Sequence, residues 1–262
     1  MQNINTDNLK LEEILSKVTG AMKQAAQIIL NADRSGDYID EKSGHANFVT
    51  VYDKKVQDCL KKSLAEILPE AAFIGEEGES DAFDGKGYAF IVDPIDGTTN
   101  FIRDYHQSAI SVGLTYDGIR VAGAVYNPYL DQMYTAILGK GAYRNDKPIH
   151  VTSNPISEAI VIFGTAPYYE ELAEVTFEKA YKIFRKSLDL RRSGTAAIDL
   201  CHIADGSADM FFELRLQPWD FAAGSLIVEE AGGVVTTTDG EPIDAFTATP
   251  ILATNGCIEQ RL

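Results

Sequence analysis

Apolar residues recur at helical spacing near the start of the chain. Between Asn8 and Leu30 they stand three or four positions apart, at Leu11, Ile14, Leu15, Val18, Met22, Ala25 and Ile29. This spacing places them on one side of a helix and leaves the other side polar, so an amphipathic helix is predicted over this stretch. A second helix is predicted from about Asp53 to Leu68, because four apolar residues share one side and Pro69 follows its end.

Short apolar runs between turn residues predict strands in the rest of the first half. The predicted strands are 72–75, 88–92, 109–116, 119–126 and 132–138. Asp117-Gly118 separates the third from the fourth and is the dipeptide of a two-residue hairpin. The first half is therefore expected to end in an antiparallel meander, whereas 42–50 shows no clear period and is predicted to be a loop.

Strands and helices alternate after a weak boundary near Asn154-Pro155. Strands are predicted at 159–163, 187–192, 208–213 and 234–238, and helices at 169–185, 195–204 and 221–231. Gly232-Gly233 is expected to end the last helix as a C-cap. Alternation of this kind is typical of an α/β layer. We expect one domain over 1–262 with two structural halves, about 1–154 with an antiparallel sheet and 155–262 with the α/β layer.

Composition narrows the class of protein. The 262 residues are 45% hydrophobic and 24% charged, as in globular proteins with a substantial core. Asp and Glu number 39 against 23 Lys and Arg, a formal net charge of −16, which argues against nucleic acid and anionic membranes as partners. No apolar run reaches the roughly 20 residues of a membrane helix. Without a signal-peptide pattern, a disulfide framework or a zinc pattern among Cys59, Cys201 and Cys257, a cytoplasmic protein is expected.

The most distinctive stretch is Asp93-Pro94-Ile95-Asp96-Gly97-Thr98-Thr99-Asn100-Phe101, directly after the predicted strand 88–92. Pro94 fixes its own φ and biases Asp93 away from helix, so a sharp turn is predicted at the strand end. Two carboxylates at one turn repel each other unless a cation lies between them, and a hard divalent cation takes oxygen ligands. A surface turn with an accidental second acid is the alternative.

The residues after the two acids predict an anion site beside the metal. Thr98-Thr99-Asn100 can cap a following helix, whose free N–H groups would face the same point. Two further acidic positions, Glu76-Glu77 and Asp220, also stand at predicted strand or helix ends. Each alone is explained by a solvated turn or a helix N-cap, but together they describe a cavity in which carboxylates surround cations.

These motifs resemble those of the inositol monophosphatase family. The resemblance is carried by Gly75-Glu76-Glu77, by the nonapeptide 93–101 and by Trp219-Asp220-Phe221-Ala222-Ala223-Gly224 with the glycine pair at 232–233. It extends over nearly the whole chain, including the loop 42–53 and the opening Ser193-Gly194-Thr195-Ala196-Ala197. It implies a five-layer α-β-α-β-α sandwich of the type shared with fructose-1,6-bisphosphatase. The implied activity is that of a magnesium-dependent, lithium-sensitive phosphomonoesterase that forms a homodimer.

The resemblance also implies roles for residues. Carried over position by position, Glu76, Asp93 and the carbonyl of Ile95 hold one Mg²⁺, Asp93, Asp96 and Asp220 hold a second, and Glu76 serves a weaker third. Thr98, supported by Asp53, orients the attacking water together with Glu76. The amides of Gly97 and Thr98 contact the phosphate, and Gly194, Thr195, Ala196 and Glu213 face the alcohol part of the substrate. Glu77 and Lys42 are possible further site residues, and Asn47 replaces an acid of the family's loop pattern.

Charge supports the metal requirement independently of the resemblance. The four acids Glu76, Asp93, Asp96 and Asp220 would repel a phosphate dianion, since each like-charge contact at ~4 Å costs on the order of 1–4 kcal/mol. Two Mg²⁺ ions reverse that repulsion and activate a water. No Ser/His/Asp or Cys/His arrangement stands out, so no protein nucleophile is expected.

The first choice of substrate is myo-inositol 1-phosphate or a similar polyol monophosphate. Glu213 is rich in acceptors for hydroxyl groups. Fructose 1,6-bisphosphate is a rival, for whose second phosphate Arg191, Arg192 and Arg215 are candidate contacts. A metal-binding regulatory protein without turnover is the alternative from another class.

Overall fold

Both predicted amphipathic helices are confirmed. In the computed structural model, which describes residues 8–33, 39–41, 48–78 and 80–262, α1 spans Asn8–Leu30 and α2 spans Val51–Ile67. Thr50 begins α2 through a capping box, because its hydroxyl accepts the N–H groups of Tyr52 and Asp53 while the Asp53 carboxylate accepts the Thr50 N–H at 2.7 Å. None of the helices in the described part of the chain is long and apolar enough to span a membrane.

The larger sheet has seven strands in chain order, from β3 to β9. They are β3 (Ala72–Gly75), β4 (Tyr88–Asp96), β5 (Ala109–Tyr116), β6 (Ile119–Asn127), β7 (Gln132–Ile137), β8 (Ala142–Arg144) and β9 (Lys147–Ile149). β3 and β4 are parallel and the remaining neighbours are antiparallel, so the predicted meander is confirmed within a mixed sheet. β8 and β9 were not predicted, because three-residue strands are too short to show alternation.

The smaller sheet has five strands in the order β11-β10-β12-β14-β13. They are β10 (Ile160–Phe163), β11 (Asp189–Arg191), β12 (Met210–Leu216), β13 (Val234–Thr236) and β14 (Thr249–Thr254). β14 was not predicted although it lies inside the sheet, since its apolar run is short and Pro250 argues against a strand. In this smaller sheet β14 pairs antiparallel with both β12 and β13, whereas the other pairings are parallel, so the predicted α/β layer is also mixed.

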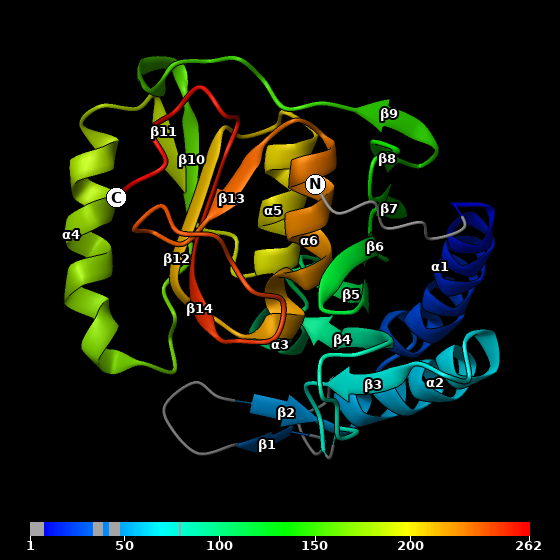
Figure 1. Cartoon of the computed structure of the whole chain (residues 1–262). Coiled ribbons are helices and arrows are strands. Elements are labelled where there is room, and N and C mark those ends of the chain that lie inside the picture. The colour runs from blue at the N-terminus through cyan, green and yellow to red at the C-terminus, as the bar shows by residue number, and fades with distance from the viewer. Residues whose placement is uncertain (1–7, 34–38, 42–47, 79) are drawn as a thin grey trace.

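Helices separate and cover the two sheets (Figure 1). α1 and α2 pack on one face of the larger sheet, and α5 (Ala196–Ala204) and α6 (Pro218–Glu230) lie between the sheets. Along β12, Phe211 faces α5 and α6, whereas Met210 and Phe212 face the outer helix α4 (Ala173–Phe184). The order of layers is therefore α-β-α-β-α, as the sequence predicted.

Some predicted boundaries are wrong. Phe48–Thr50, predicted as loop, forms β2 and pairs with β1 (Ile39–Glu41). The helix predicted from residue 169 begins as the 3₁₀ turn Glu170–Leu172 before α4, and a second 3₁₀ turn is Ile156–Glu158. The short helix α3 (Thr98–Ile102) follows β4.

Two glycines let α6 lie close to the larger sheet. Gly113 of β5 and Gly123 of β6 are direct cross-strand partners; Gly113 faces Ala222 and Ala223 of α6, and Gly123 faces Ala223. A Cβ atom at Gly123 would stand 3.0 Å from the backbone oxygen of Ala223, closer than ordinary van der Waals contact. Asp220 belongs to the first turn of α6. The close contact therefore also sets the position of its carboxylate relative to the larger sheet.

We predict that Gly123→Ala lowers the free energy of unfolding by about 1–3 kcal/mol, because the added methyl group meets backbone that cannot move aside. Urea unfolding measures the effect. Gly20→Ala is the matched control: Gly20 is exposed within α1 with nothing within 4 Å of its added Cβ, and alanine there should raise stability by up to about 1 kcal/mol. A stability gain from Gly123→Ala would contradict the packing argument.

Candidate active site

A bulge at the end of β4 turns two acids to the same side. The strand does not end at Val92; it continues to Asp96, so the turn predicted at Pro94 is wrong. Asp93 pairs with Ser111 of β5 and Asp96 pairs with Ala109, so three steps along β4 match two along β5. In a regular strand, residues three apart point to opposite faces, and one extra residue restores the same face.

The third acid stands in the first turn of α6. Gln217 is the N-cap, and its N–H donates to Oδ2 of Asp220 at 2.7 Å, so the helix begins at Pro218 rather than at the predicted residue 221. Asp220 closes a capping box, which holds its carboxylate to the helix start. The hydroxyl of Ser111, the β5 partner of Asp93, donates to the carbonyl of Trp219 at 3.1 Å and ties this turn to the sheet.

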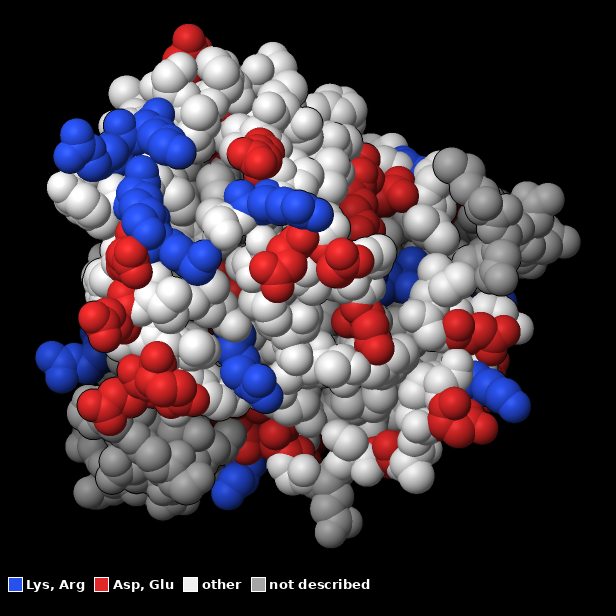
Figure 2. Space-filling model, turned by 60° about the vertical axis from the view of Figure 1, so that its left-hand side comes forward, with Lys and Arg blue, Asp and Glu red and all other residues white. Residues whose placement is uncertain are grey.

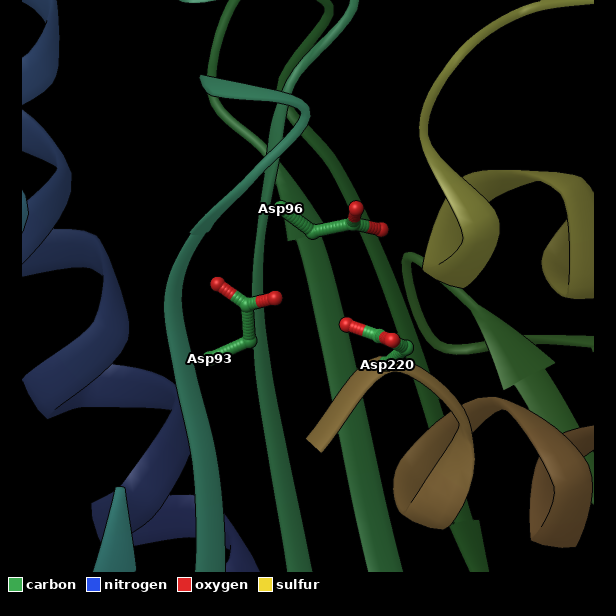
Figure 3. A group of neighbouring side chains, drawn as sticks. All are labelled: Asp93, Asp96 and Asp220. Carbon is green, nitrogen blue, oxygen red and sulfur yellow. The ribbon is translucent and has the colours of Figure 1, made fainter. Parts of the chain in front are cut away.

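Asp93, Asp96 and Asp220 converge (Figure 3). One carboxylate oxygen from each lies within 4.8 Å of the others. They line a cavity of about 340 Å³ whose wall also includes Glu76, Ile95 and residues 97–98. The structure thus brings together acids from the end of β4 and the start of α6, as the sequence analysis expected.

Burial and mutual repulsion make these acids weak. Burial raises the pKa of Asp93 and of Asp220 well above the ordinary value, and the neighbouring carboxylates raise both pKa values further. Burial raises the pKa of Asp96 to about 7, although the N–H of Ala197 donates to its Oδ2 at 2.6 Å and opposes the rise. A hard divalent cation fits this set, because every donor is an oxygen and the charges need compensation.

Glu76 lines the same cavity from the turn after β3. Its carboxylate is not part of the group of three, and its N–H donates to the carbonyl of Val92 at 3.2 Å. Glu77, a possible site residue from the sequence, is buried and does not line the cavity. Instead, its backbone forms two hydrogen bonds with the side chain of Gln57.

Asp53 and Thr98 meet beneath the acids. One oxygen of the buried Asp53 accepts both the N–H and the hydroxyl of Thr50, at 2.7 and 2.6 Å. The other stands 3.3 Å from the hydroxyl of Thr98, which also lies 3.2 Å from the carbonyl of Ile95. Thr98 does not cap α3 as predicted, because the N-cap is Gly97 in the left-handed region at φ 84°. The adjacent side chain of Thr195 leaves no room for a Cβ atom at Gly97.

A second lobe of about 210 Å³ continues the cavity. It shares Asp96, Glu213 and Asp220 with the first lobe and adds Gly194, Thr195 and Ala196, so it holds all the residues predicted to face the alcohol. Burial raises the pKa of Glu213 to about 7, while the N–H of Ala166 holds its Oε1 at 2.7 Å. Lys42 and Asn47 lie outside the described residues.

Asn100 and Asp199 are site residues whose positions the sequence analysis missed. The amide of Asn100 donates to the carbonyls of Gln107 and Ser193 and to the hydroxyl of Thr195, and so joins the β4–β5 connection to the second lobe. Asp199 lines that lobe, is 1% exposed and has one carboxylate oxygen without a hydrogen-bond partner among the described residues. Asn100 stands in the distinctive stretch 93–101 but was expected only as part of a helix cap, and Asp199 does not depart from ordinary helix sequence, so only the structure reveals these contacts.

Two arginines line the cavity, Arg192 in the second lobe and Arg215 in the first. Arg191 lines neither lobe and pairs with Asp189. Basic side chains elsewhere belong to other surfaces: Lys179, Lys182, Lys186 and Arg261 line a separate hollow beside α4. On the face of the molecule shown in Figure 2, several basic side chains gather in one area and acidic ones are spread over much of the rest. The cavity itself is dominated by acids.

Comparison with known proteins gives matches over almost the full chain. A model of the inositol monophosphatase family matches residues 10–262. The chain is 36% identical to inositol monophosphatase 2 of Solanum lycopersicum, over 94% of each chain. The crystal structure of extragenic suppressor protein suhB from Bartonella henselae has a TM-score of 0.87 at 32% identity, covering 93% of this chain and 94% of that one. A structure of SaIMPase-II bound to inositol monophosphate has a TM-score of 0.78 at 30% identity, covering 93% and 89%.

The raised pKa values predict that the metal-free protein loses stability as pH rises. Burial raises the pKa of Asp96 from its ordinary 3.8 to about 7 in the folded state. The folded state therefore binds more protons between these values, and the free energy of unfolding decreases from about pH 4 to about pH 7. Thermal unfolding in EDTA at pH 5 to 8 measures this trend. Asp96→Asn removes one titrating group, so its Tm should exceed that of the wild type at pH 8 and approach it at pH 5. A pH-independent difference would contradict the assignment.

Proposed function

The chain belongs to the inositol monophosphatase family, and we propose that this phosphatase hydrolyses a small polyol phosphate monoester, with myo-inositol 1-phosphate as the first choice. The proposal rests on the convergence of three aspartates, two buried and one partly buried, in one lobe of a cavity whose other lobe presents polar groups suited to an alcohol. A lithium-sensitive homodimer is part of the proposal, on the family resemblance.

Two or three Mg²⁺ ions would be held by the acids of the first lobe. Glu76, Asp93 and the carbonyl of Ile95 would hold one ion, and Asp93, Asp96 and Asp220 a second, with Glu76 also serving a third. When bound, Mg²⁺ supplies the positive charge that attracts phosphate and lowers the pKa of a water molecule. This charge is needed because, within the described part of the chain, no lysine or arginine forms an ion pair with Asp93, Asp96 or Asp220.

Asp53 and Thr98 would orient the attacking water. Because Thr50 occupies one oxygen of Asp53, the other is fixed toward the hydroxyl of Thr98 and can accept its proton. The Thr98 oxygen then keeps a lone pair for a water hydrogen, which directs that water alongside Glu76. The N–H groups of Gly97 and Thr98 would contact the phosphate.

The second lobe would bind the alcohol. Glu213 accepts one backbone N–H and has further lone pairs for substrate hydroxyls. Gly194, Thr195 and Ala196 form the start of α5 beside it. The contacts of Asn100 with Ser193 and Thr195 hold this segment against the first lobe, so that the ester and the alcohol are positioned together.

Fructose 1,6-bisphosphate is the second candidate substrate. It is favoured by Arg192 and Arg215, since a guanidinium group in each lobe offers paired donors to a second phosphate. A metal-binding regulatory protein without turnover would show Mg²⁺ binding and no phosphate release across a panel of monoesters.

We predict that Asp220→Asn reduces phosphate release by at least about 100-fold at saturating Mg²⁺, because a charged ligand is lost while an amide oxygen can still accept the Gln217 N–H. Circular dichroism should report an intact fold. Asp58→Asn on the exposed side of α2 removes the same charge and should leave turnover unchanged. Activity of Asp220→Asn close to that of wild type would rule out its assignment as a metal ligand.

Arg192→Met tests the choice of substrate. If the chain acts on bisphosphates, kcat/KM for fructose 1,6-bisphosphate should fall about tenfold more than kcat/KM for myo-inositol 1-phosphate, since only the former presents a second phosphate. Steady-state assays of both substrates measure the ratio. Arg191→Met, outside the cavity, is the control. An equal loss of kcat/KM for both substrates would show that Arg192 does not contact a second phosphate, and myo-inositol 1-phosphate would remain the preferred substrate.

A further inference from the structure

α2 presents two buried polar side chains to the active site, one helical turn apart. Asp53 contacts Thr98, as described above, and is fully buried. Gln57, which is 7% exposed, lies four residues later on the same face and reaches the turn that follows β3. That turn carries Glu76. We propose that Gln57 is a positioning residue for Glu76, acting through the backbone of Glu77; the inference rests on the proposed role of Glu76 as a metal ligand.

The Gln57 amide binds the backbone of Glu77 at two points. Its Oε1 accepts the N–H of Glu77 at 2.9 Å, and its Nε2 donates to the carbonyl oxygen of Glu77. These groups belong to the peptide planes on either side of the Glu77 Cα atom, and the first of those planes also carries the Cα atom of Glu76. From the other side, the N–H of Glu76 donates to Val92 of β4. The backbone of Glu76 is thus held between the sheet and α2.

Gly75 supplies an independent sign that this contact is built in. A Cβ atom at Gly75 would overlap Oε1 and Cδ of Gln57, as well as the ring of Phe73. Gly75 is not among the glycines with positive φ, so its backbone does not require a glycine. The space beside Gly75 is instead filled by the Gln57 amide. The glycine at position 75 therefore leaves room for the Gln57 side chain, which in turn binds the backbone of Glu77.

Loss of the Gln57 amide should affect the position of Glu76 and not the positions of the three aspartates. Asp93 and Asp96 are held by β4 and Asp220 by the capping box of α6, whereas the side-chain hydrogen bonds of Gln57 go to Glu77. Without the amide, the peptide planes around Glu77 lose their partner on α2, and Glu76 samples a wider range of positions. Groups that orient metal ligands typically contribute 10–100-fold in metal affinity or activity. We expect the weakening to fall on ions that share Glu76 and to be recovered at high Mg²⁺.

The test variant is Gln57→Met, which keeps the length of the side chain and removes both hydrogen bonds. Isothermal titration of the metal-free protein with Mg²⁺, without substrate, should show about tenfold weaker binding in at least one class of sites. The Mg²⁺ concentration for half-maximal phosphate release should rise by a similar factor, with kcat at saturating Mg²⁺ within about threefold of wild type. Gln57→Ala is the second variant and should give the same shift.

Leu64→Val is the matched control for stability. Leu64 lies on α2, is 1% exposed and packs in the core between α1, α2 and the larger sheet. It should lower Tm in EDTA and leave Mg²⁺ affinity unchanged, which separates destabilisation of α2 from misplacement of Glu76. Wild-type Mg²⁺ affinity in a folded Gln57 variant, or an equal affinity loss in Leu64→Val, would overturn the proposal. If wild type binds Mg²⁺ but hydrolyses no monoester, the proposed function fails while the titration still decides the role of Gln57.

Discussion

Repulsion between buried carboxylates is the constraint on which the rest of the structure depends. Asp93, Asp96 and Asp220 place oxygens within 4.8 Å of one another inside a cavity, where each like-charge contact costs on the order of 1–4 kcal/mol. Among the described residues, no lysine or arginine forms an ion pair with any of the three. The chain holds each acid by a backbone N–H, from Ile95, Ala197 and Gln217 respectively. A peptide donor fixes a carboxylate without cancelling its charge, so the positions are set while the demand for a cation remains.

The surrounding fold supplies the rigidity that this arrangement needs. β4 lies within the seven-stranded sheet, and α6 lies between both sheets with its first turn bonded to β5 through Ser111. The glycine pair Gly113 and Gly123 allows the helix to approach the strands closely. Asn100 then joins the β4 end to the start of α5, so the metal lobe and the alcohol lobe share one frame. Residues from both halves of the chain are therefore required for one cavity.

The sequence predicted the parts of this frame that follow from periodicity or from dense motifs. The span of α1 and the five-layer order are confirmed, and the residues of the central motif do meet Asp220. The bulge in β4 could not be predicted, because Pro94 alone is compatible with either a turn or a bulge. β14 was missed since its pairing with β12 and β13 is decided by distant residues. Gln57 was missed because its partner is backbone, which leaves no trace in side-chain patterns.

Because of the extra residue in β4, the active site depends on the number of residues between Asp93 and Asp96 as well as on their chemistry. If β4 paired regularly with β5 over this interval, without the bulge, Asp93 and Asp96 would point to opposite faces of the sheet, one of them toward α1 and α2. Another apolar residue could replace Ile95, since its side chain is buried and its polar contact with Thr98 is made by the backbone carbonyl. Inserting or deleting a residue there would change the spacing of the two acids along β4 even with both retained. The two residues between Asp93 and Asp96 should therefore tolerate substitution far better than insertion or deletion.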